Sequence, residues 1–373
     1  METLAKIDVA GRDAIVAAAI SAGFHTAAIA PAPESGSAEE SVLRERFAEF
    51  IDRGRAGEMT YLQRANEQGE MLRTSLHTAF PWARSIVLCG FNYNADEVRS
   101  VDPAPQSTGW VARYAWSGDG ERATDYHEIL IAKLRVVEAS ILEAAPTATT
   151  KCYVDTGPMV ERHFAQLAGL GWIGKNTCVL SQHQGSWMLL GVIVTSLEVQ
   201  AEAVLSPAAD RCGSCTRCID ACPTDALIAP RQMDASLCIA YLTIEKKGSI
   251  AEELRAPMGR QIFGCDICQD VCPWNRKAPI GGGQQMQPRQ ELINPSLEWI
   301  AAMESAEFRM QFRGSPLERT GKKRLRRNTA IAMGNSGDTL HLPRLRQWAA
   351  GDDAVLAEAA QWAMARIEES SLC

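Results

Sequence analysis

Residues 212–223 read C-G-S-C-T-R-C-I-D-A-C-P, so that Cys212, Cys215, Cys218 and Cys222 are followed at once by Pro223. The spacing C-x₂-C-x₂-C-x₃-C-P is typical of proteins that hold [4Fe–4S] clusters. The first three thiolates bind one cluster, whereas the fourth cysteine of this pattern binds the other cluster of a two-cluster protein. The stretch therefore predicts two clusters and requires a second set of cysteines.

A second set is present at residues 265–273, which read C-D-I-C-Q-D-V-C-P. Ile262 occupies the position of the missing first cysteine, and Cys238 is the one cysteine between the two runs. A zinc site or disulfides are the alternative, but one tetrahedral zinc uses four thiolates and leaves the other four cysteines without a ligand role. We predict that Cys212, Cys215, Cys218 and Cys272 hold one cluster, and that Cys222, Cys238, Cys265 and Cys268 hold the other.

Composition limits the class of protein. The 373 residues are enough for two or three domains, and the net charge of −7 restricts any nucleic-acid contact to a local basic patch. The other cysteines have no ligand spacing and are expected to be ordinary thiols: Cys89, Cys152, Cys178 and Cys373. No apolar run approaches the ~18 residues of a membrane span. The first residues lack a basic or twin-arginine segment. We expect a cytoplasmic protein with no membrane partner.

Helices and strands alternate before the cysteine runs. Strands are expected at 26–30, 85–92, 152–155 and 187–196, and helices at 8–22, 40–53, 159–168 and from Asp125 onward. We predict an α+β protein with an N-terminal α/β domain at 1–203 and a dicluster ferredoxin-like domain at 204–282. Residues 283–373 have the apolar spacing of HEAT-like helical repeats. Residues 281–285, which read G-G-G-Q-Q, are expected to form a flexible connector.

The roughly 200 residues before the clusters need a function, because a simple electron carrier needs only the cluster region. Gly169, Gly171 and Gly174 match the glycine spacing of a dinucleotide site, but they follow an expected helix and not a strand. A nicotinamide site is therefore unsupported. Something else in this region should receive the electrons.

Several motifs together resemble epoxyqueuosine reductase, a cobalamin- and iron–sulfur-dependent family of tRNA-modification enzymes. They are V-D-T-G-P-M-V-E-R at 154–162, A-G-L-G-W-I-G-K-N at 168–176, D-Y-H at 125–127, A-Y-L-T-I-E at 240–245, R-R-N at 326–328, and both cysteine runs. The resemblance covers about residues 40–335. Gly157 stands where the family usually has alanine, and the segment 118–124 is longer than the family pattern.

The resemblance implies an oxidoreductase that converts epoxyqueuosine to queuosine at the wobble position of tRNA. It implies that an external donor supplies electrons, that the clusters pass them on to give cob(I)alamin, and that Asp155 protonates the opened epoxide. A helix cap is the competing role for Asp155. His127 is expected to make a hydrogen bond at a helix start and not to bind cobalt. The implied cobalamin contacts are Arg73, Arg113, Tyr114, Asp155, Lys175, Asn176 and Tyr241, for most of which a core or surface role is the alternative.

A basic run at 322–327, K-K-R-L-R-R, stands out in an acidic chain. Five cations in six residues can neutralise several phosphates, although a solvated helix face is the usual alternative. Its place in the helical region favours the tRNA anticodon stem-loop as partner of Lys322, Lys323, Arg324, Arg326 and Arg327. We expect a monomer. The alternative functions are a cobalamin-dependent reductive dehalogenase and a dicluster electron carrier.

Overall fold

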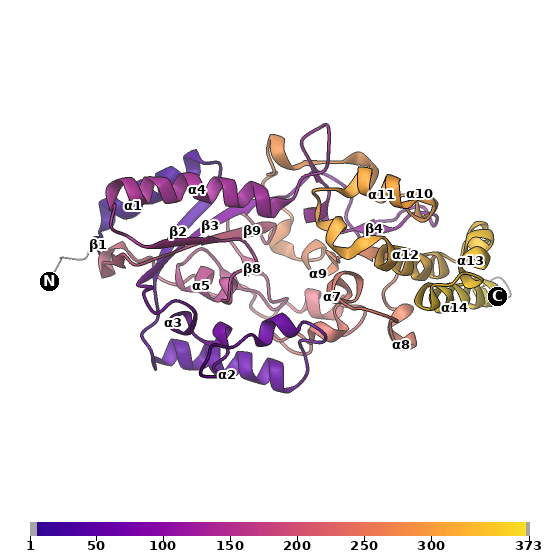
Figure 1. Cartoon of the computed structure of the whole chain (residues 1–373), viewed down its shortest axis with the longest axis horizontal. Coiled ribbons are helices and arrows are strands. Elements are labelled where there is room, and N and C mark those ends of the chain that lie inside the picture. Colours follow the sequence, from indigo (N-terminus) through magenta and orange to yellow (C-terminus); the bar gives the residue numbers. More distant parts are fainter. Residues whose placement is uncertain (1–5, 371–373) are drawn as a thin grey trace.

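A computed structural model describes residues 6–370 and is organised around a four-stranded sheet (Figure 1). The strand order is β2-β3-β9-β6, and all neighbouring pairs are antiparallel. The four strands lie within a few residues of the predicted positions: β2 (Thr26–Pro31), β3 (Ser85–Asn92), β6 (Thr150–Tyr153) and β9 (Met188–Thr195). The prediction of a mixed helix and strand protein is confirmed.

Helices cover both faces of this sheet. Val87 and Cys89 of β3 pack with α1 (Val9–Ser21) and α4 (Tyr126–Ala144), whereas Ile86 and Leu88 pack with α3 (Leu76–Ala79) and α5 (Glu161–Leu167). Successive side chains of a strand point to opposite faces, so β3 is apolar at nearly every position because both of its faces are buried. The helix α2 (Ala38–Asp52) lies outside α3 (Figure 1).

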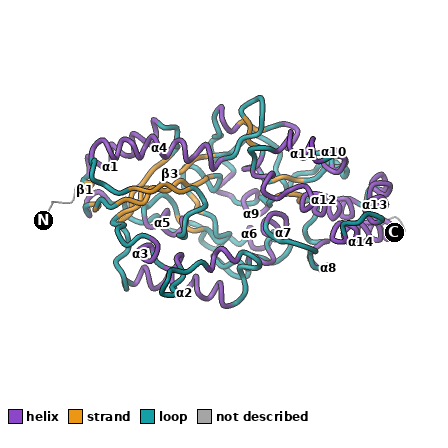
Figure 2. Tube along the Cα trace, in the orientation of Figure 1, coloured by secondary structure: helices purple, strands orange, loops and turns teal. Residues whose placement is uncertain are grey.

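Short elements make up the cysteine-rich segment, as Figure 2 shows by the large share of loop between the sheet and the C-terminal helices. These elements are α6 (Arg217–Asp220), α7 (Ile239–Ile244), α8 (Glu252–Arg255), β11 (Gln261–Phe263) and α9 (Ile267–Asp270). Strand β11 pairs with β4 (Trp110–Val111) from the N-terminal half. The remaining short strands form three pairs: β1 (Lys6–Ile7) with β10 (Glu198–Val199), β7 (Trp172–Ile173) with β8 (Val179–Leu180), and β5 (Ser117–Gly118) with β12 (Gln287–Pro288).

The C-terminal region is helical from α10 onward and shares its core with the cysteine-rich segment. Asn328 is buried on the longest of these helices, and its side-chain amide donates to the carbonyls of Thr243 and Ile262 at 2.9 Å each. The helix breaks at Gly321, where φ is 74°. The helices are α10 (Leu297–Ala302), α11 (Ser305–Phe312), α12 (Pro316–Ser336), α13 (Leu342–Ala349) and α14 (Ala354–Ser370).

Residues 281–283 are held firmly against the end of β3. The amide of Gly281 donates to the carbonyl of Asn94 at 2.9 Å, and that of Gly282 to Asn92 at 2.7 Å. A Cβ on Gly281 would lie 2.3 Å from the Asn92 carbonyl oxygen, so only glycine fits this approach. The prediction of a flexible connector is wrong, because close packing fixes this segment.

Two of the remaining predictions concern the chain ends and the unassigned cysteines. Cys89 and Cys152 are buried thiols, as expected. The first five residues, on which the absence of a leader was argued, and Cys373 lie outside the described residues. Within residues 6–370, no helix is both long and apolar enough to cross a membrane.

Candidate active site

Asp155 lies in the turn between β6 and α5, where the chain leaves the sheet. Its φ is 54°, a left-handed conformation that aspartate tolerates better than bulkier residues do. The residue is exposed, and its Oδ2 accepts a hydrogen bond of 3.1 Å from the hydroxyl of Tyr126. The side chain does not cap α5, because no side chain caps that helix. The turn therefore presents the carboxylate outward.

Tyrosine rings surround this carboxylate. Tyr126, at the start of α4, lies edge-on to Tyr114 with ring centroids 5.8 Å apart. Burial strongly raises the pKa of Tyr126, and the negative charge of Asp155 raises it further. Partial burial, followed by the charges of Glu245 and Asp155, raises the pKa of Tyr61 to about 12. Burial raises the pKa of Tyr114 as well, so all three phenols remain neutral hydrogen-bond donors at physiological pH.

Arg73 and Glu161 stand behind the turn. Nη1 of Arg73 donates to the carbonyl of Met159 at 2.7 Å, and the guanidinium is attracted to Glu161 and Asp155. Burial, followed by the negative charge of Asp155, raises the pKa of Glu161 to about 8, although the Asp155 amide donates to the Glu161 carboxyl group. Glu161 is half-buried as a residue, but its Oε1 is closed off from solvent and has no partner. Glu161 is thus a neutral acid at pH 7.

The C-terminal helices reach this site through Arg319. Asp125 caps α4 by accepting from the amide of His127 at 2.9 Å, which confirms the expected hydrogen bond at the helix start. Arg319, just before the break in α12, contacts Asp125 and lies 2.8 Å from Nδ1 of His127. Burial opposes ionisation of Asp125, but the hydrogen bonds from His127 and the charge of Arg319 outweigh it and lower its pKa.

The cysteines gather in two groups, and the described ones form no disulfide. Burial raises the pKa of Cys272, and the thiolates of Cys212 and Cys215 raise it further. Burial likewise raises the pKa of Cys218, with further contributions from Cys272 and Cys212. These four thiols therefore lie near one another, and their assignment to one cluster stays a prediction.

In the second group, Cys268 lies on α9, Cys238 and Cys265 lie just before α7 and α9, and Cys222 follows α6. Burial raises the pKa of Cys265, and the neighbouring thiolates of Cys238 and Cys222 raise it further. The hydrogen bond between Cys268 and Cys178 makes the largest contribution to the raised pKa of Cys268. The nearby thiolates of Cys265 and Cys238 raise that pKa further. Cys178, which was expected to be an ordinary buried thiol and not a ligand, is partly buried and lies against Cys268.

The described residues hold no ready-made site for a single metal ion. Among residues 6–370, no three His, Cys, Asp or Glu side chains converge on one point as the ligands of a single ion do. The thiolates of a cubane cluster each bind a different iron and so stand further apart. Trp172 covers the first group, with its indole N–H 3.4 Å from Sγ of Cys212, and packs edge-on against Trp274.

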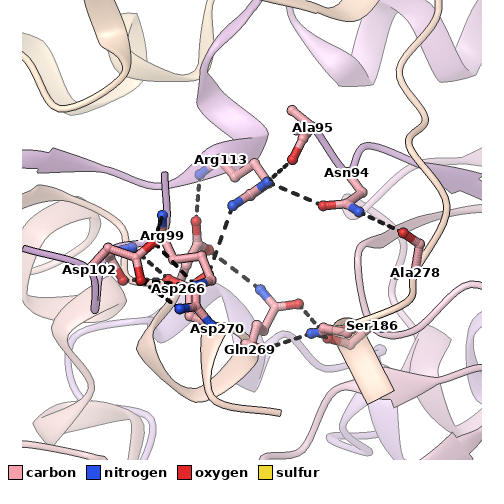
Figure 3. Close-up of polar contacts among 12 residues, drawn as sticks. Asn94, Ala95, Arg99, Asp102, Arg113, Ser186, Asp266, Gln269, Asp270 and Ala278 are labelled. Carbon is pink, nitrogen blue, oxygen red and sulfur yellow. Dashed lines mark hydrogen bonds and ion pairs between the residues drawn. The ribbon is translucent and has the colours of Figure 1, made fainter. Parts of the chain in front are cut away.

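Arg113 was predicted to contact cobalamin, but it is the centre of a buried polar network (Figure 3). Its amide donates to Oδ2 of Asp266 at 2.6 Å, and its guanidinium contacts Asn94, the Ala95 carbonyl and Asp270. The guanidinium also lies over the ring of Trp187, 4.6 Å from its centre. These contacts correct the prediction, because they leave the side chain no open face.

Three further predicted cofactor contacts instead join parts of the chain. Lys175 donates to the Gly213 carbonyl at 2.7 Å, and the buried amide of Asn176 donates to the Cys268 carbonyl at 3.3 Å. Both therefore hold the loops that carry the cysteines. Tyr241 is buried, and its hydroxyl accepts from the amide of Glu58 at 2.8 Å. Of the predicted contacts, Arg73 and Tyr114 lie with Asp155.

The basic run at 322–327 mostly faces inward. Arg327 is 1% exposed and donates to the carbonyls of Leu242, Lys246 and Gly248. Burial lowers its pKa to about 10. The prediction that Arg327 contacts tRNA is wrong, because its guanidinium lies in the core.

The other cations of this run are engaged to different degrees. Arg324 donates to the Thr320 and Ile244 carbonyls, and Arg326 to the Met303 carbonyl. Lys322 pairs with Glu304 at 3.3 Å. Lys323 is the most exposed of the five, with 88% of its side chain exposed, and its ammonium lies 3.8 Å from a carboxylate oxygen of Asp353.

Comparison with known proteins identifies the family. The family model of the 4Fe-4S double cluster binding domain matches residues 211–275, and that of epoxyqueuosine reductase QueG, DUF1730, matches residues 73–156. Epoxyqueuosine reductase of Synechocystis sp. is 38% identical over 302 residues, which cover 80% of this chain and 97% of the relative. The chain belongs to the epoxyqueuosine reductase family. The Escherichia coli member is 33% identical over 326 residues, covering 87% of this chain and 83% of its own.

Solved structures of this family agree with the fold. A selenomethionine-labelled epoxyqueuosine reductase superposes with a TM-score of 0.83 at 28% identity, covering 95% of this chain and 90% of its own. A complex with an epoxyqueuosine-modified tRNA-Tyr stem loop gives 0.80 at 29% identity with the same coverage. The Bacillus subtilis enzyme, with its catalytic aspartate loop swung out of the active site, gives 0.80 at 28% identity and again the same coverage.

The family assignment makes this chain an oxidoreductase with two [4Fe–4S] clusters. Residue-level analysis of the sequence overlooked Tyr61, Tyr126 and Glu161 as members of the Asp155 site. Tyr126 and Glu161 stood within quoted motifs, so a signal was available for them. Tyr61 carried no signal, because only the fold brings it near Asp155.

Proposed function

We propose that this chain reduces epoxyqueuosine to queuosine in tRNA, with Asp155 as the proton donor and a bound cobalamin as the electron-rich reductant. The observation that carries the proposal is the outward-facing carboxylate of Asp155, set among neutral tyrosines in a chain that also groups eight cysteines. The tRNA stem loop bound by one relative and the catalytic aspartate loop of another support the substrate and the acid.

The reaction needs two electrons and two protons for each epoxide. The two C–O bonds of the ring break in turn, a carbon–carbon double bond forms, and the oxygen leaves as water. Opening of the first C–O bond leaves an alkoxide, and an acid within hydrogen-bond reach must protonate it. Asp155 supplies this proton from the end of its turn, with Tyr126 holding Oδ2 at 3.1 Å.

The residues around Asp155 are of the chemical types that can contact cobalamin. Tyr61 is 46% exposed and offers an aromatic surface, Arg73 offers a cation, and Oε1 of Glu161 is a buried polar atom without a partner. When bound, cobalamin supplies a strongly nucleophilic metal centre that the side chains of a protein lack. We assign Arg73, Tyr114 and Asp155 to this cofactor, and we assign Arg113, Lys175, Asn176 and Tyr241 to holding the surrounding walls together.

Glu161 is the proton store behind Asp155 in this proposal. Once Asp155 has given up its proton, it carries a negative charge beside a carboxyl group that is still neutral at pH 7. The Asp155 amide donates to that carboxyl group, so Glu161 also holds the turn in place. Replacement of Glu161 by glutamine would keep the acceptor but remove the proton.

The three regions then divide the work. Residues 1–203 bind cobalamin, 204–282 hold the clusters in the two groups of four, and 283–373 form a HEAT-like region that contacts the tRNA. Within the basic run, Lys323 is the side chain best placed for a phosphate, since it is by far the most exposed and its one ion pair, with Asp353, is long at 3.8 Å. The working unit is a monomer served by an external electron donor.

An anaerobic single-turnover reaction tests the proposal. Cluster- and cobalamin-loaded protein is mixed with reductant and tRNA carrying epoxyqueuosine, and the nucleosides are weighed by mass spectrometry. We expect loss of one oxygen atom with the unmodified chain and at least a hundredfold slower loss with Asp155→Asn. Asp119→Asn, a change on an exposed loop, is the matched control. Unchanged turnover by Asp155→Asn would remove Asp155 from its role, and no conversion by the unmodified chain would refute the function.

A further inference from the structure

A cleft of about 420 Å³ opens beside the cysteine runs. Arg99, Arg217 and Arg276 stand around it, and Val101 and Val271 give it an apolar part. We call it the arginine cleft. It is separate from the Asp155 site, and the mechanism above assigns it no role.

The wall of the arginine cleft is the backbone that carries cluster ligands. Three residues that line the cleft each directly precede a predicted cluster ligand. They are Arg217 before Cys218, Ala221 before Cys222, and Val271 before Cys272. Under the grouping above, Cys218 and Cys272 belong to one cluster and Cys222 to the other. An occupant of the cleft would therefore lie within one residue of ligands to both clusters.

The cleft is positive although the chain as a whole carries a charge of −7. Within the described part of the chain, Arg217 and Arg276 are exposed and make no side-chain hydrogen bond or ion pair with another residue. Arg99 pairs with Asp102 at 2.6 Å on the rim. The unpaired charges are thus arginines that point to solvent.

Two carboxylates line the cleft, and they offset only part of the arginine charge. The side chain of Asp270 is 1% exposed and accepts from the amide and hydroxyl of Ser100 at 2.9 and 2.6 Å, with Arg113 behind it (Figure 3). Asp220 is exposed but accepts a 2.8 Å hydrogen bond from Thr216. An arriving partner therefore meets more unpaired positive than negative charge.

We propose that the arginine cleft is the docking surface for the external electron donor, a small redox protein with an acidic face around its own redox centre. The inference rests on the proposed function, which requires electrons from outside. A small apolar centre with a charged rim suits a transient electron-transfer encounter, which buries less than about 1,200 Å². Opposite charge on the partner would raise the association rate and orient the two redox centres.

Each encounter moves one electron and no atoms. The donor is oxidised by one electron, and the cluster nearest the cleft is reduced by one. Two encounters supply the two electrons that one epoxide consumes, and the protons arrive separately through Asp155 and solvent. A donor that fits this chemistry is an acidic one-electron carrier, such as a flavodoxin, which serves as the probe.

Charge reversal at the two unpaired arginines tests the docking surface. In the full-length, cluster- and cobalamin-loaded protein, Arg217→Glu with Arg276→Glu should slow cluster reduction by photoreduced flavodoxin at least tenfold in stopped-flow absorbance. The salt dependence of that rate should flatten, because the attraction that salt screens is gone. Titration with oxidised flavodoxin should show at least tenfold weaker binding. Reduction by the cationic methyl viologen radical should not slow.

Matched variants separate docking from general damage. Arg46→Glu with Arg84→Glu makes the same charge change at two exposed arginines, one on α2 and one just before β3, and should leave the flavodoxin rate within twofold. Arg217→Gln with Arg276→Gln gives a milder change, should the reversal prevent cluster loading. An equal fall in the control pair, or an unchanged flavodoxin rate in the reversed pair, would overturn the proposal. A loss of tRNA affinity with an unchanged flavodoxin rate would make the cleft a phosphate surface instead.

Failure of this proposal is distinguishable from failure of the proposed function. Epoxyqueuosine conversion driven by methyl viologen does not need the docking surface, so the reversed pair should still convert tRNA with that reductant. If methyl viologen drives conversion but the rate of reduction by flavodoxin is the same in the reversed pair, the proposed function is supported and the docking surface is refuted. If viologen drives no conversion in the unmodified chain, the proposed function falls.

Discussion

The cysteine runs and the basic run at 322–327 are both dense, short motifs, yet the fold uses them in different ways. The cysteines of the two runs lie close to one another in the fold, and their division into the two groups stays a prediction. The basic run places Arg327 in the core and directs Arg324 and Arg326 at carbonyls of neighbouring loops and helices. Only Lys323 keeps the open exposure that a nucleic-acid contact requires.

The difference lies in how many uses each side chain has. Eight cysteines at this spacing are typical of one function, which is to bind the iron of [4Fe–4S] clusters through thiolates. A guanidinium carries five N–H donors and satisfies carbonyls in the core as readily as phosphates at the surface. A cluster of arginines therefore predicts a tRNA surface much less strongly than a cluster of cysteines predicts iron.

Removal of a cluster ligand should have the largest effect. Cys265→Ser should reduce the iron content from about 8 to about 4 atoms per chain and abolish epoxyqueuosine conversion, because one cluster loses a thiolate. Iron and sulfide analysis measures the first effect, and nucleoside mass spectrometry the second. Cys152→Ser, at a buried thiol outside the groups, should retain all the iron. Retention of about 8 irons by Cys265→Ser would break the predicted grouping.

Arg327 should matter for stability and not for tRNA contact. Arg327→Met leaves the carbonyls of Leu242, Lys246 and Gly248 without their donor, which should lower the free energy of unfolding by about 3 kcal/mol or more. Thermal or denaturant unfolding of the loaded protein measures this change. Lys323→Met, four positions earlier in the same run, should leave stability within about 0.5 kcal/mol. Equal free energies of unfolding for Arg327→Met and Lys323→Met would contradict the assignment of Arg327 to the core.

Glu161 should make stability depend on pH. Its pKa in the folded chain is about 8 against an ordinary 4.5, so the folded state keeps a proton that the unfolded state releases between these values. Rising pH in that window favours unfolding, and the effect is complete above about pH 8. Arg73 and Arg162 oppose the shift, whereas Asp155 adds to it.

Glu161→Gln should therefore be more stable than the unmodified chain by an amount that grows from pH 5 to pH 8 and reaches a few kcal/mol at most. Unfolding curves at several pH values measure the difference. Glu143→Gln, an exposed change on α4, should show no such trend. Parallel curves for the unmodified chain and Glu161→Gln would mean that Glu161 is ionised in the folded state.

Lys323 should give the smallest effect. Lys323→Ala should weaken binding of the tRNA stem loop a few-fold at about 0.1 M salt and reduce the salt slope by about 1, as expected for loss of one phosphate contact. Filter binding across a salt series measures both quantities. Arg46→Ala is the matched control on α2. An unchanged slope would leave the basic run without any contact to tRNA.

The sequence alone determined the chemistry that depends on residue type and short-range spacing. The two groups of cysteines, the helix start at Asp125 and the strand at Ser85–Asn92 all follow from local pattern, because thiolate spacing, capping and alternating burial are local properties. The family motifs added the identity of the substrate and of the proposed acid, which no local physical argument contained.

Only the tertiary structure decided which polar side chains remain available. Burial changed Arg327 from a candidate tRNA contact into a core residue, made Arg113 the centre of an internal network, and gave Glu161 a raised pKa. It also brought Tyr61 to Asp155 and three arginines to one cleft. Solvent exposure and charge environment are set by segments far apart in the chain, so no local pattern reports them.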